Sequence, residues 1–133
     1  MPDPYTAIQI VMMPRDTNPH GTIFGGVILS YIDMAGATAA RREVVLRGGS
    51  PAIKMVTVAL NRVEFKEPVL VGDVVRFETT VGHVGRTSIT MHVNVVAERA
   101  GQSIRVTDAE VVYVGVDDNR QPVPLVPGKP AAG

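Results

Sequence analysis

One carboxylate in an otherwise apolar stretch is the residue of this sequence that most suggests chemistry. Asp33 lies between Ile32 and Met34, in a segment whose hydrophobic pattern predicts a buried helix. Burying a carboxylate away from water costs free energy unless a hydrogen-bond or charge partner stabilises it, and a carboxylate that faces a cleft can serve as a base. Two roles remain open: a catalytic carboxylate, or a structural one that is bonded to neighbouring backbone or to Arg62.

A pair of glycines, Gly25 and Gly26, opens the same predicted helix. The free N–H groups at a helix N-terminus attract negative charge, and glycine lets a substrate oxygen approach the backbone. Such an end can polarise a carbonyl and hold the oxyanion that develops there. Asp33 follows Gly26 by seven residues, close to two turns, so we expect its carboxylate on the same side as that end. Glycines that serve packing alone are the alternative.

The elements that position these residues are predicted from hydrophobic periodicity. A helix is expected from Val27 to about Val45, apolar all round in its first half, with small residues that allow close packing. Strands are expected over residues 5–13, 53–60, 74–81, 87–96 and 103–116. The last four strands are joined largely by short turns, at residues 71–73, 82–86 and 99–101, so we expect antiparallel pairing.

One long apolar helix and one antiparallel sheet can bury each other only if the sheet curls around the helix. The predicted fold class is therefore α+β, a curled antiparallel five- to six-stranded sheet wrapped around one long central helix. Residues 1–133 are expected to form a single domain, with residues 119–133 as an extended Pro-rich tail. Such a sheet leaves an edge strand uncovered, and dimerisation that joins two sheets would cover it.

Composition narrows the classes of function. The chain has 13 Lys and Arg residues against 13 Asp and Glu, which argues against nucleic-acid and membrane partners. It has no cysteine, which excludes a thiolate nucleophile and a Cys-based metal site. His20, His83 and His92 lack a metal-ligand spacing, so no metal is expected. No targeting or membrane-spanning stretch is predicted, so a cytoplasmic protein is expected.

Two runs of residues resemble a known family. DTNPHGTIFGG at residues 16–26 and SYIDMAGA at residues 30–37 resemble segments of the YciA-like acyl-CoA thioesterases, which are hydrolases with the hotdog fold. Similar segments occur at 56–58, 65–69, 71–75, 85–89 and 113–117, so the resemblance covers roughly residues 8–126. It implies hydrolysis of an acyl-CoA thioester to a carboxylic acid and coenzyme A. No cofactor is implied, because coenzyme A is part of the substrate.

The resemblance also implies roles for single residues. Asp33 resembles the family's catalytic carboxylate, acting as general base on water or as nucleophile towards the thioester carbonyl. Asn18 resembles its partner, contributed by the other subunit, and the backbone N–H of Gly25 or Gly26 would hold the thioester oxygen. A turn that consists of Gly85, Arg86, Thr87 and Ser88 resembles the region in which this family contacts coenzyme A. A homodimer with shared active sites is implied, assembled further as a trimer of dimers.

The sequence departs from the family pattern at two positions, and two other functions remain as alternatives to thioester hydrolysis. Asn61 stands where several relatives have an acidic residue, and Phe24 is His in some of them. A hotdog enoyl-CoA hydratase would use an acid and a histidine near the start of the helix, here Asp16 and His20. A non-catalytic acyl-CoA-binding or sensing protein would bind its ligand without turnover. A serine hydrolase is excluded, since the chain lacks the GxSxG pattern and is too short for that fold.

Overall fold

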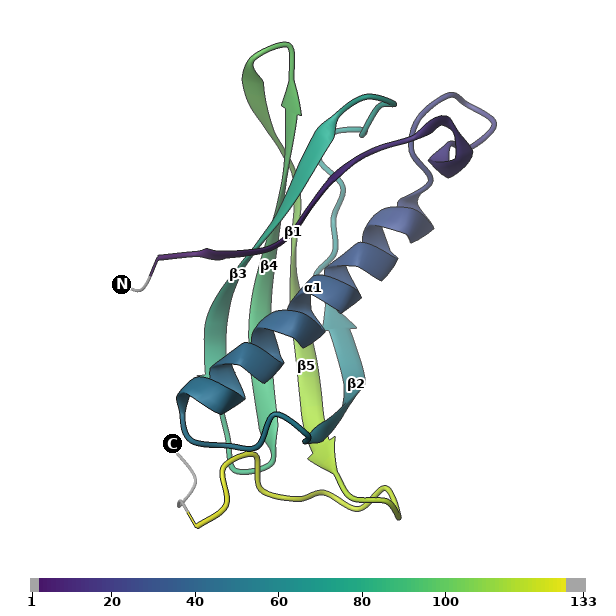
Figure 1. Cartoon of the computed structure of the whole chain (residues 1–133). Helices are drawn as coiled ribbons and strands as arrows, with labels where there is room; N and C mark the ends of the chain where they lie inside the picture. The colour runs from purple at the N-terminus through teal and green to yellow at the C-terminus, as the bar shows by residue number, and fades with distance from the viewer. Residues whose placement is uncertain (1–2, 129–133) are drawn as a thin grey trace.

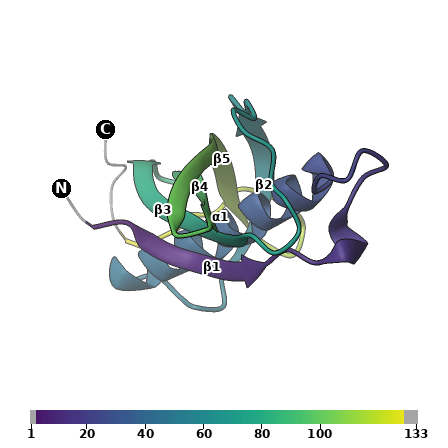
Figure 2. The ribbon, with the colours of Figure 1, turned by 90° about the horizontal axis from the view of Figure 1, so that it is seen from above.

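One long helix, α1 (Gly25–Leu46), lies against a five-stranded antiparallel sheet in the computed structural model, which describes residues 3–128 (Figure 1). The strands are β1 (Tyr5–Val11), β2 (Lys54–Asn61), β3 (Val74–Val84), β4 (Ser88–Arg99) and β5 (Gln102–Val116). Their order across the sheet is β1-β3-β4-β5-β2. Viewed from above, the sheet curves around the helix (Figure 2). The predicted α+β class with a curled antiparallel sheet is confirmed.

The helix begins two residues before its predicted start. Phe24 caps it with an extended backbone (φ −61°, ψ 130°), and Gly25 and Gly26 form its first turn. The strand predicted to end at Met13 ends at Val11 instead, and a short 3-10 turn follows at Pro14–Asp16. The two glycines therefore lie inside the helix, where their N–H groups belong to the unpaired donors of a helix N-terminus.

The β3–β4 hairpin is longer than the sequence pattern indicated. Its predicted turn at residues 82–86 is wrong in its first part, because β3 continues to Val84 across a register shift between Val81 and His83. Gly82 lies at this shift, where a Cβ would lie 2.6 Å from the Nε2 atom of His92 on β4. A larger residue at this position would require the exposed His92 ring to move aside, which glycine avoids.

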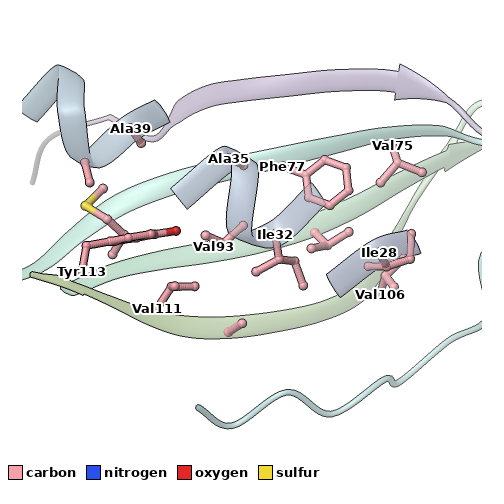
Figure 3. Packing of buried hydrophobic residues seen from close by; sticks show 14 of the residues in the cluster. Ile28, Ile32, Ala35, Ala39, Val75, Phe77, Val93, Val106, Val111 and Tyr113 are labelled. Carbon is pink, nitrogen blue, oxygen red and sulfur yellow. The ribbon is translucent and has the colours of Figure 1, made fainter. Parts of the chain in front are cut away.

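The core lies between α1 and the inner face of the sheet (Figure 3). The alternation predicted for the fourth strand is confirmed, since Ile89, Met91, Val93 and Val95 are all buried. On the helix, the buried positions recur every three or four residues, as a single core-facing stripe requires. They are Ile28, Ile32, Ala35, Gly36, Ala39, Ala40 and Val44. Small residues in the middle of this stripe bring the helix close to the sheet.

The strand β2 is an edge of the sheet and carries apolar side chains in the open. Val56, Val58 and Leu60 are 43%, 55% and 38% exposed. Soluble monomers rarely leave an edge both apolar and uncovered, because it invites pairing with another chain. Beyond β5, residues 119–128 contain no helix or strand apart from a bridge between Val116 and Pro122. The last part of the predicted tail, residues 129–133, lies outside the described residues.

Candidate active site

The carboxylate of Asp33 lies on α1 where the helix faces β2 and β5. The Thr57 hydroxyl donates to Asp33 Oδ1 at 2.8 Å. The Tyr113 hydroxyl lies 2.8 Å from the backbone carbonyl of Asp33 and 3.2 Å from Oδ1, as in a three-centre hydrogen bond. Both donors therefore act on the same carboxylate oxygen. Within residues 3–128, no donor to the second oxygen, Oδ2, is found, so that atom is left for water or substrate.

The sheet register brings the two hydroxyls together. Thr57 on β2 is directly opposite Tyr113 on β5, so both side chains project from the same face of the sheet, towards α1. A register shift follows immediately, between Thr57 and Ala59. Such a bulge re-aims the side chains beyond it, and Thr57 is the last residue of the regular ladder before it. Periodicity alone cannot pair Thr57 with Tyr113, which are 56 positions apart in the sequence, although each lies in a segment that carried the family resemblance.

Tyr113 is a neutral donor in this environment. Its ring is 1% exposed, and a Cβ at Gly36 would lie 2.3 Å from its hydroxyl oxygen, so only glycine leaves room there. Burial, the charge of Asp33 and the hydrogen bond to Asp33 together raise the pKa of Tyr113 well above its ordinary value. The hydroxyl therefore keeps its proton at neutral pH.

The structural alternative in which Arg62 holds Asp33 finds no support. The side-chain donors to Asp33 are the two hydroxyls, and no ion pair within residues 3–128 includes this carboxylate. Arg62 is exposed and has a left-handed backbone at the end of β2 (φ 57°). Asp33 is half-buried and held by neutral donors, an arrangement that leaves its charge uncompensated and available.

The N-terminal end of α1 opens into a cavity of about 310 Å³. Its wall is mostly apolar and consists of Thr22, Ile23, Gly25, Ile28, Phe65, Lys66, Glu67, Pro68 and Val69. The Phe65 ring lies above Gly25, 3.8 Å from where a Cβ would be. First-turn N–H groups and the positive end of the helix dipole thus meet an apolar cavity, where an interaction with a carbonyl oxygen is stronger than in water.

Asn18 organises the loop before the helix. Its side-chain Nδ2 donates to the Thr22 hydroxyl at 2.8 Å, and its Oδ1 accepts from the amides of His20 at 2.9 Å and Thr22 at 3.2 Å. The same loop is tied to the cavity wall, because the Ile23 amide donates to the Val69 carbonyl at 2.8 Å. Asn18 is thus at the cavity end of α1 and does not bond to Asp33 of its own chain.

The Asp73–Arg99 ion pair fixes the far wall of this cavity. The Asp73 carboxylate is 2% exposed and accepts from Arg99 through Nε at 2.9 Å and Nη2 at 2.7 Å, and from the Leu70 amide at 2.9 Å. Arg99 also donates to the Pro68 carbonyl at 3.0 Å. Burial disfavours the charge, but these donors outweigh it and hold the pKa of Asp73 below its ordinary value.

The sequence-predicted site residues do not meet within one chain. Seven residues at 1.5 Å each place Asp33 about 10 Å along the helix axis from Gly26, too far for both to act on one carbonyl. The turn Gly85–Ser88 lies at the opposite end of the sheet, where the carbonyls of Arg86 and Thr87 accept from the amides of Leu125 and Gly115 (Figure 1). One chain therefore does not bring Asp33, its own glycine end and this turn together.

The other candidate residues of the sequence have ordinary surroundings. His20, His83 and His92 are all exposed, and residues 3–128 contain no group of three potential metal ligands. The Asp16 carboxylate accepts from the Met13 amide at 3.1 Å, as a cap of the 3-10 turn. The pair required by a hydratase therefore shows no arrangement for catalysis. No helix of the described chain is both long and apolar enough to cross a membrane.

Comparison with known proteins supports one family. The model of the thioesterase superfamily matches residues 20–104. The acyl-CoA thioester hydrolase YciA of Salmonella typhimurium is 36% identical over 123 residues, 89% of this chain and 87% of its own. The hexameric hotdog fold thioesterase of Campylobacter jejuni shares 44% identity over 90% of this chain and 88% of its own, with a TM-score of 0.79. The hexameric thioesterase from Yersinia pestis shares 36% sequence identity over 96% of this chain and 100% of its own, with a TM-score of 0.83.

These matches extend over the segments that build the site. The family model spans the last residues of the loop before α1, the helix itself, β2 and the hairpin of β3 and β4, whereas Asn18 and Tyr113 lie outside the matched residues. The likeness to the solved structures covers nearly the whole length of both chains. The chain therefore belongs to the thioesterase superfamily, among its YciA-like acyl-CoA thioester hydrolases with the hotdog fold.

Proposed function

We propose that this protein hydrolyses acyl-CoA thioesters to a carboxylic acid and coenzyme A, with Asp33 as its catalytic carboxylate. The observation that carries the proposal is the half-buried Asp33 with one oxygen held by two hydroxyls and the other left open. A carboxylate held in this way presents Oδ2 in one orientation, which is what a proton acceptor or nucleophile needs. A binding or sensing protein has no use for such an arrangement.

The reaction needs the carboxylate and an oxyanion site on opposite sides of one thioester carbonyl. As a base, Asp33 takes a proton from water while the water oxygen attacks the carbonyl carbon; the C–S bond then breaks and the coenzyme A sulfur leaves with that proton. As a nucleophile, the same Oδ2 attacks the carbonyl carbon and forms a mixed anhydride, while the C–S bond breaks and the coenzyme A thiolate leaves. Water then opens the anhydride, which releases the carboxylic acid, restores the Asp33 carboxylate and supplies the proton that the thiolate takes up. In both routes the amide of Gly25 or Gly26 at the end of α1 stabilises the carbonyl oxygen as it gains charge.

The second half of each site comes from another copy of the chain. Because about 10 Å separates Asp33 from the end of its own helix, the oxyanion donors that serve Asp33 belong to the partner, together with Asn18. The exposed apolar edge β2 carries Thr57, so pairing of two copies along β2 would cover the edge and enclose the site. Assembly of three such dimers would give the hexamer described for the Campylobacter and Yersinia proteins.

The coenzyme A moiety is proposed to contact the turn Gly85–Ser88. This turn presents the exposed side chain of Arg86, and a guanidinium suits a phosphate group. A cavity of about 400 Å³ lies at the same end of the sheet, between the start of β2, the end of β5 and residues 123–127. Its wall includes Leu125, whose amide donates to the Arg86 carbonyl at 2.9 Å.

The decisive experiment replaces Asp33 by asparagine and measures acyl-CoA hydrolysis by release of free thiol. Asp33→Asn keeps the size of the side chain and its ability to accept from Thr57 and Tyr113, but it removes the basic oxygen. We expect the rate constant kcat to fall by at least about 1,000-fold while the protein keeps its oligomeric state. The exposed Asp3→Asn is the matched control and should retain full activity. A folded Asp33→Asn protein with wild-type kcat would refute the mechanism.

A further inference from the structure

We infer that Tyr113 is a positioning residue for catalysis: its buried hydroxyl hydrogen-bonds to both the carboxylate and the backbone carbonyl of Asp33 and so fixes the orientation of the carboxylate. Gly36 provides the space that this hydroxyl occupies. The inference rests on the proposed function, since it assigns to Tyr113 the orientation of the reacting carboxylate. Figure 3 shows the Tyr113 ring beneath the part of α1 that carries Ala35 and Ala39.

The contacts of Tyr113 go beyond those of a core aromatic residue. Its hydroxyl reaches the Asp33 carbonyl at 2.8 Å and the Asp33 Oδ1 at 3.2 Å, so one group holds the backbone and the side chain of the same residue. A side chain tethered to its own backbone through a shared donor loses much of its rotational freedom. Thr57 also donates to Oδ1, but it is exposed in the single chain, whereas Tyr113 is almost completely buried.

Gly36 has a specific place in this arrangement. It lies three residues after Asp33, on the helical face that packs on Tyr113, and it is buried. A Cβ at this position would lie 2.3 Å from the Tyr113 hydroxyl oxygen and 3.2 Å from the adjoining ring carbon. Glycine in a helix interior is less favourable than alanine by about 1 kcal/mol, so its presence here needs a reason. The space that the hydroxyl occupies supplies that reason.

The neutral state of Tyr113 suits this role. Burial and the nearby Asp33 charge both raise the pKa of Tyr113, so at neutral pH the hydroxyl is protonated and acts as a donor. Both oxygens of the carboxylate would otherwise be equivalent. Two donors to Oδ1 single out Oδ2 as the oxygen that faces the reaction, and no cation within residues 3–128 pairs with the group.

The test is Tyr113→Phe, which removes one hydroxyl and keeps the ring. We expect kcat to fall about 10-fold to 100-fold, the effect of losing a hydrogen bond to a charged group, with KM changed less than 3-fold. The acidic limb of the pH–rate profile should move towards higher pH, because a carboxylate that loses a hydrogen-bond donor binds a proton more readily. Tyr5→Phe on β1, at the opposite edge of the sheet, is the matched control and should match wild type in both measurements.

A double-mutant cycle with Gly36→Ala keeps the inference falsifiable even if one variant is unstable. Gly36→Ala alone should lower kcat about as much as Tyr113→Phe, because the new methyl group displaces the hydroxyl. In the Tyr113→Phe background the atom that clashes is absent, so the same change should cost less than a further 3-fold. Full additivity of the two losses would overturn the inference.

The outcomes separate this inference from the proposed function. A Tyr113→Phe protein that melts earlier but keeps the wild-type kcat and the wild-type acidic limb would show a packing role only, and would overturn the inference while Asp33→Asn is still inactive. A wild-type protein that hydrolyses no acyl-CoA would instead refute the proposed function itself.

Discussion

The separation between Asp33 and the glycine end of its helix predicts that two inactive variants can restore activity to each other. One variant is Asp33→Asn. The other is Gly25→Pro, which removes an N–H group at the first helical position, where proline fits without breaking the helix. Phe24 already has the extended backbone that a residue before proline requires (φ −61°, ψ 130°). Loss of one oxyanion donor should lower kcat by about 100-fold to 1,000-fold.

The magnitude of the recovery follows from how a shared site is built. In the proposed shared site, Asp33 comes from one chain and the helix end from another, so random assembly of equal amounts gives an intact Asp33 in about half of the sites. An intact helix end occurs independently in about half, so about one quarter of the sites are complete. A site contained within one chain would never become complete, because every chain carries one of the two lesions.

The assay mixes the two variants in equal amounts under denaturing conditions, refolds them together and measures thioester hydrolysis. We expect about 25% of the activity of wild type refolded in the same way, and each variant refolded alone should remain near background. Size-exclusion chromatography with light scattering confirms that all samples reach the same assembly. Background activity in the mixture, with normal assembly, would refute the reasoning from the helix geometry.

Three further outcomes are expected. Asp73→Asn should lower the free energy of unfolding, measured in urea at neutral pH, by about 2–4 kcal/mol. Because the pKa of Asp73 is depressed in the folded state, the difference between wild type and variant should persist above about pH 4 and disappear as the pH falls through the folded pKa. An equal difference at pH 2 and pH 7 would contradict this prediction. Val58→Lys on the exposed edge should shift the assembly towards monomers with a parallel loss of activity, measured by light scattering, whereas an unchanged oligomer would place the interface elsewhere. Arg86→Ala should raise KM several-fold with kcat nearly unchanged, an effect that shrinks in 0.5 M salt; a change confined to kcat would exclude a phosphate contact.

Much of the fold follows from local pattern. The alternation from Ile89 to Val95 predicts a half-buried strand, and the run of apolar residues after Gly26 predicts a buried helix; both are confirmed. Strand ends were less predictable. β3 passes through Gly82, which resembles a turn residue, because pairing with β4 outweighs local preference. Contacts of this kind are made by residues that are neighbours only in the sheet.

Some residues of the candidate site could also be predicted from the sequence, and others could not. The sequence singled out Asp33 because a carboxylate in an apolar helix is anomalous wherever it occurs, and it identified the glycine end because helix termini attract negative charge. It could not identify Thr57 and Tyr113 as the donors, because their meeting at Oδ1 depends on the β2–β5 register. A polar residue inside an apolar strand was the only signal, and many threonines and tyrosines share it.

The chemistry available to this protein can be read from its residues: one carboxylate in an apolar helix, one glycine-opened helix end and no thiol. How these groups are combined depends on the folded chain. The helix rise separates Asp33 from its own glycine end by about 10 Å, and the strand register places two hydroxyls on a single carboxylate oxygen. The physical reason is that composition and periodicity report what each residue is and which way it faces, whereas distances between functional groups arise only when elements far apart in the chain are packed together.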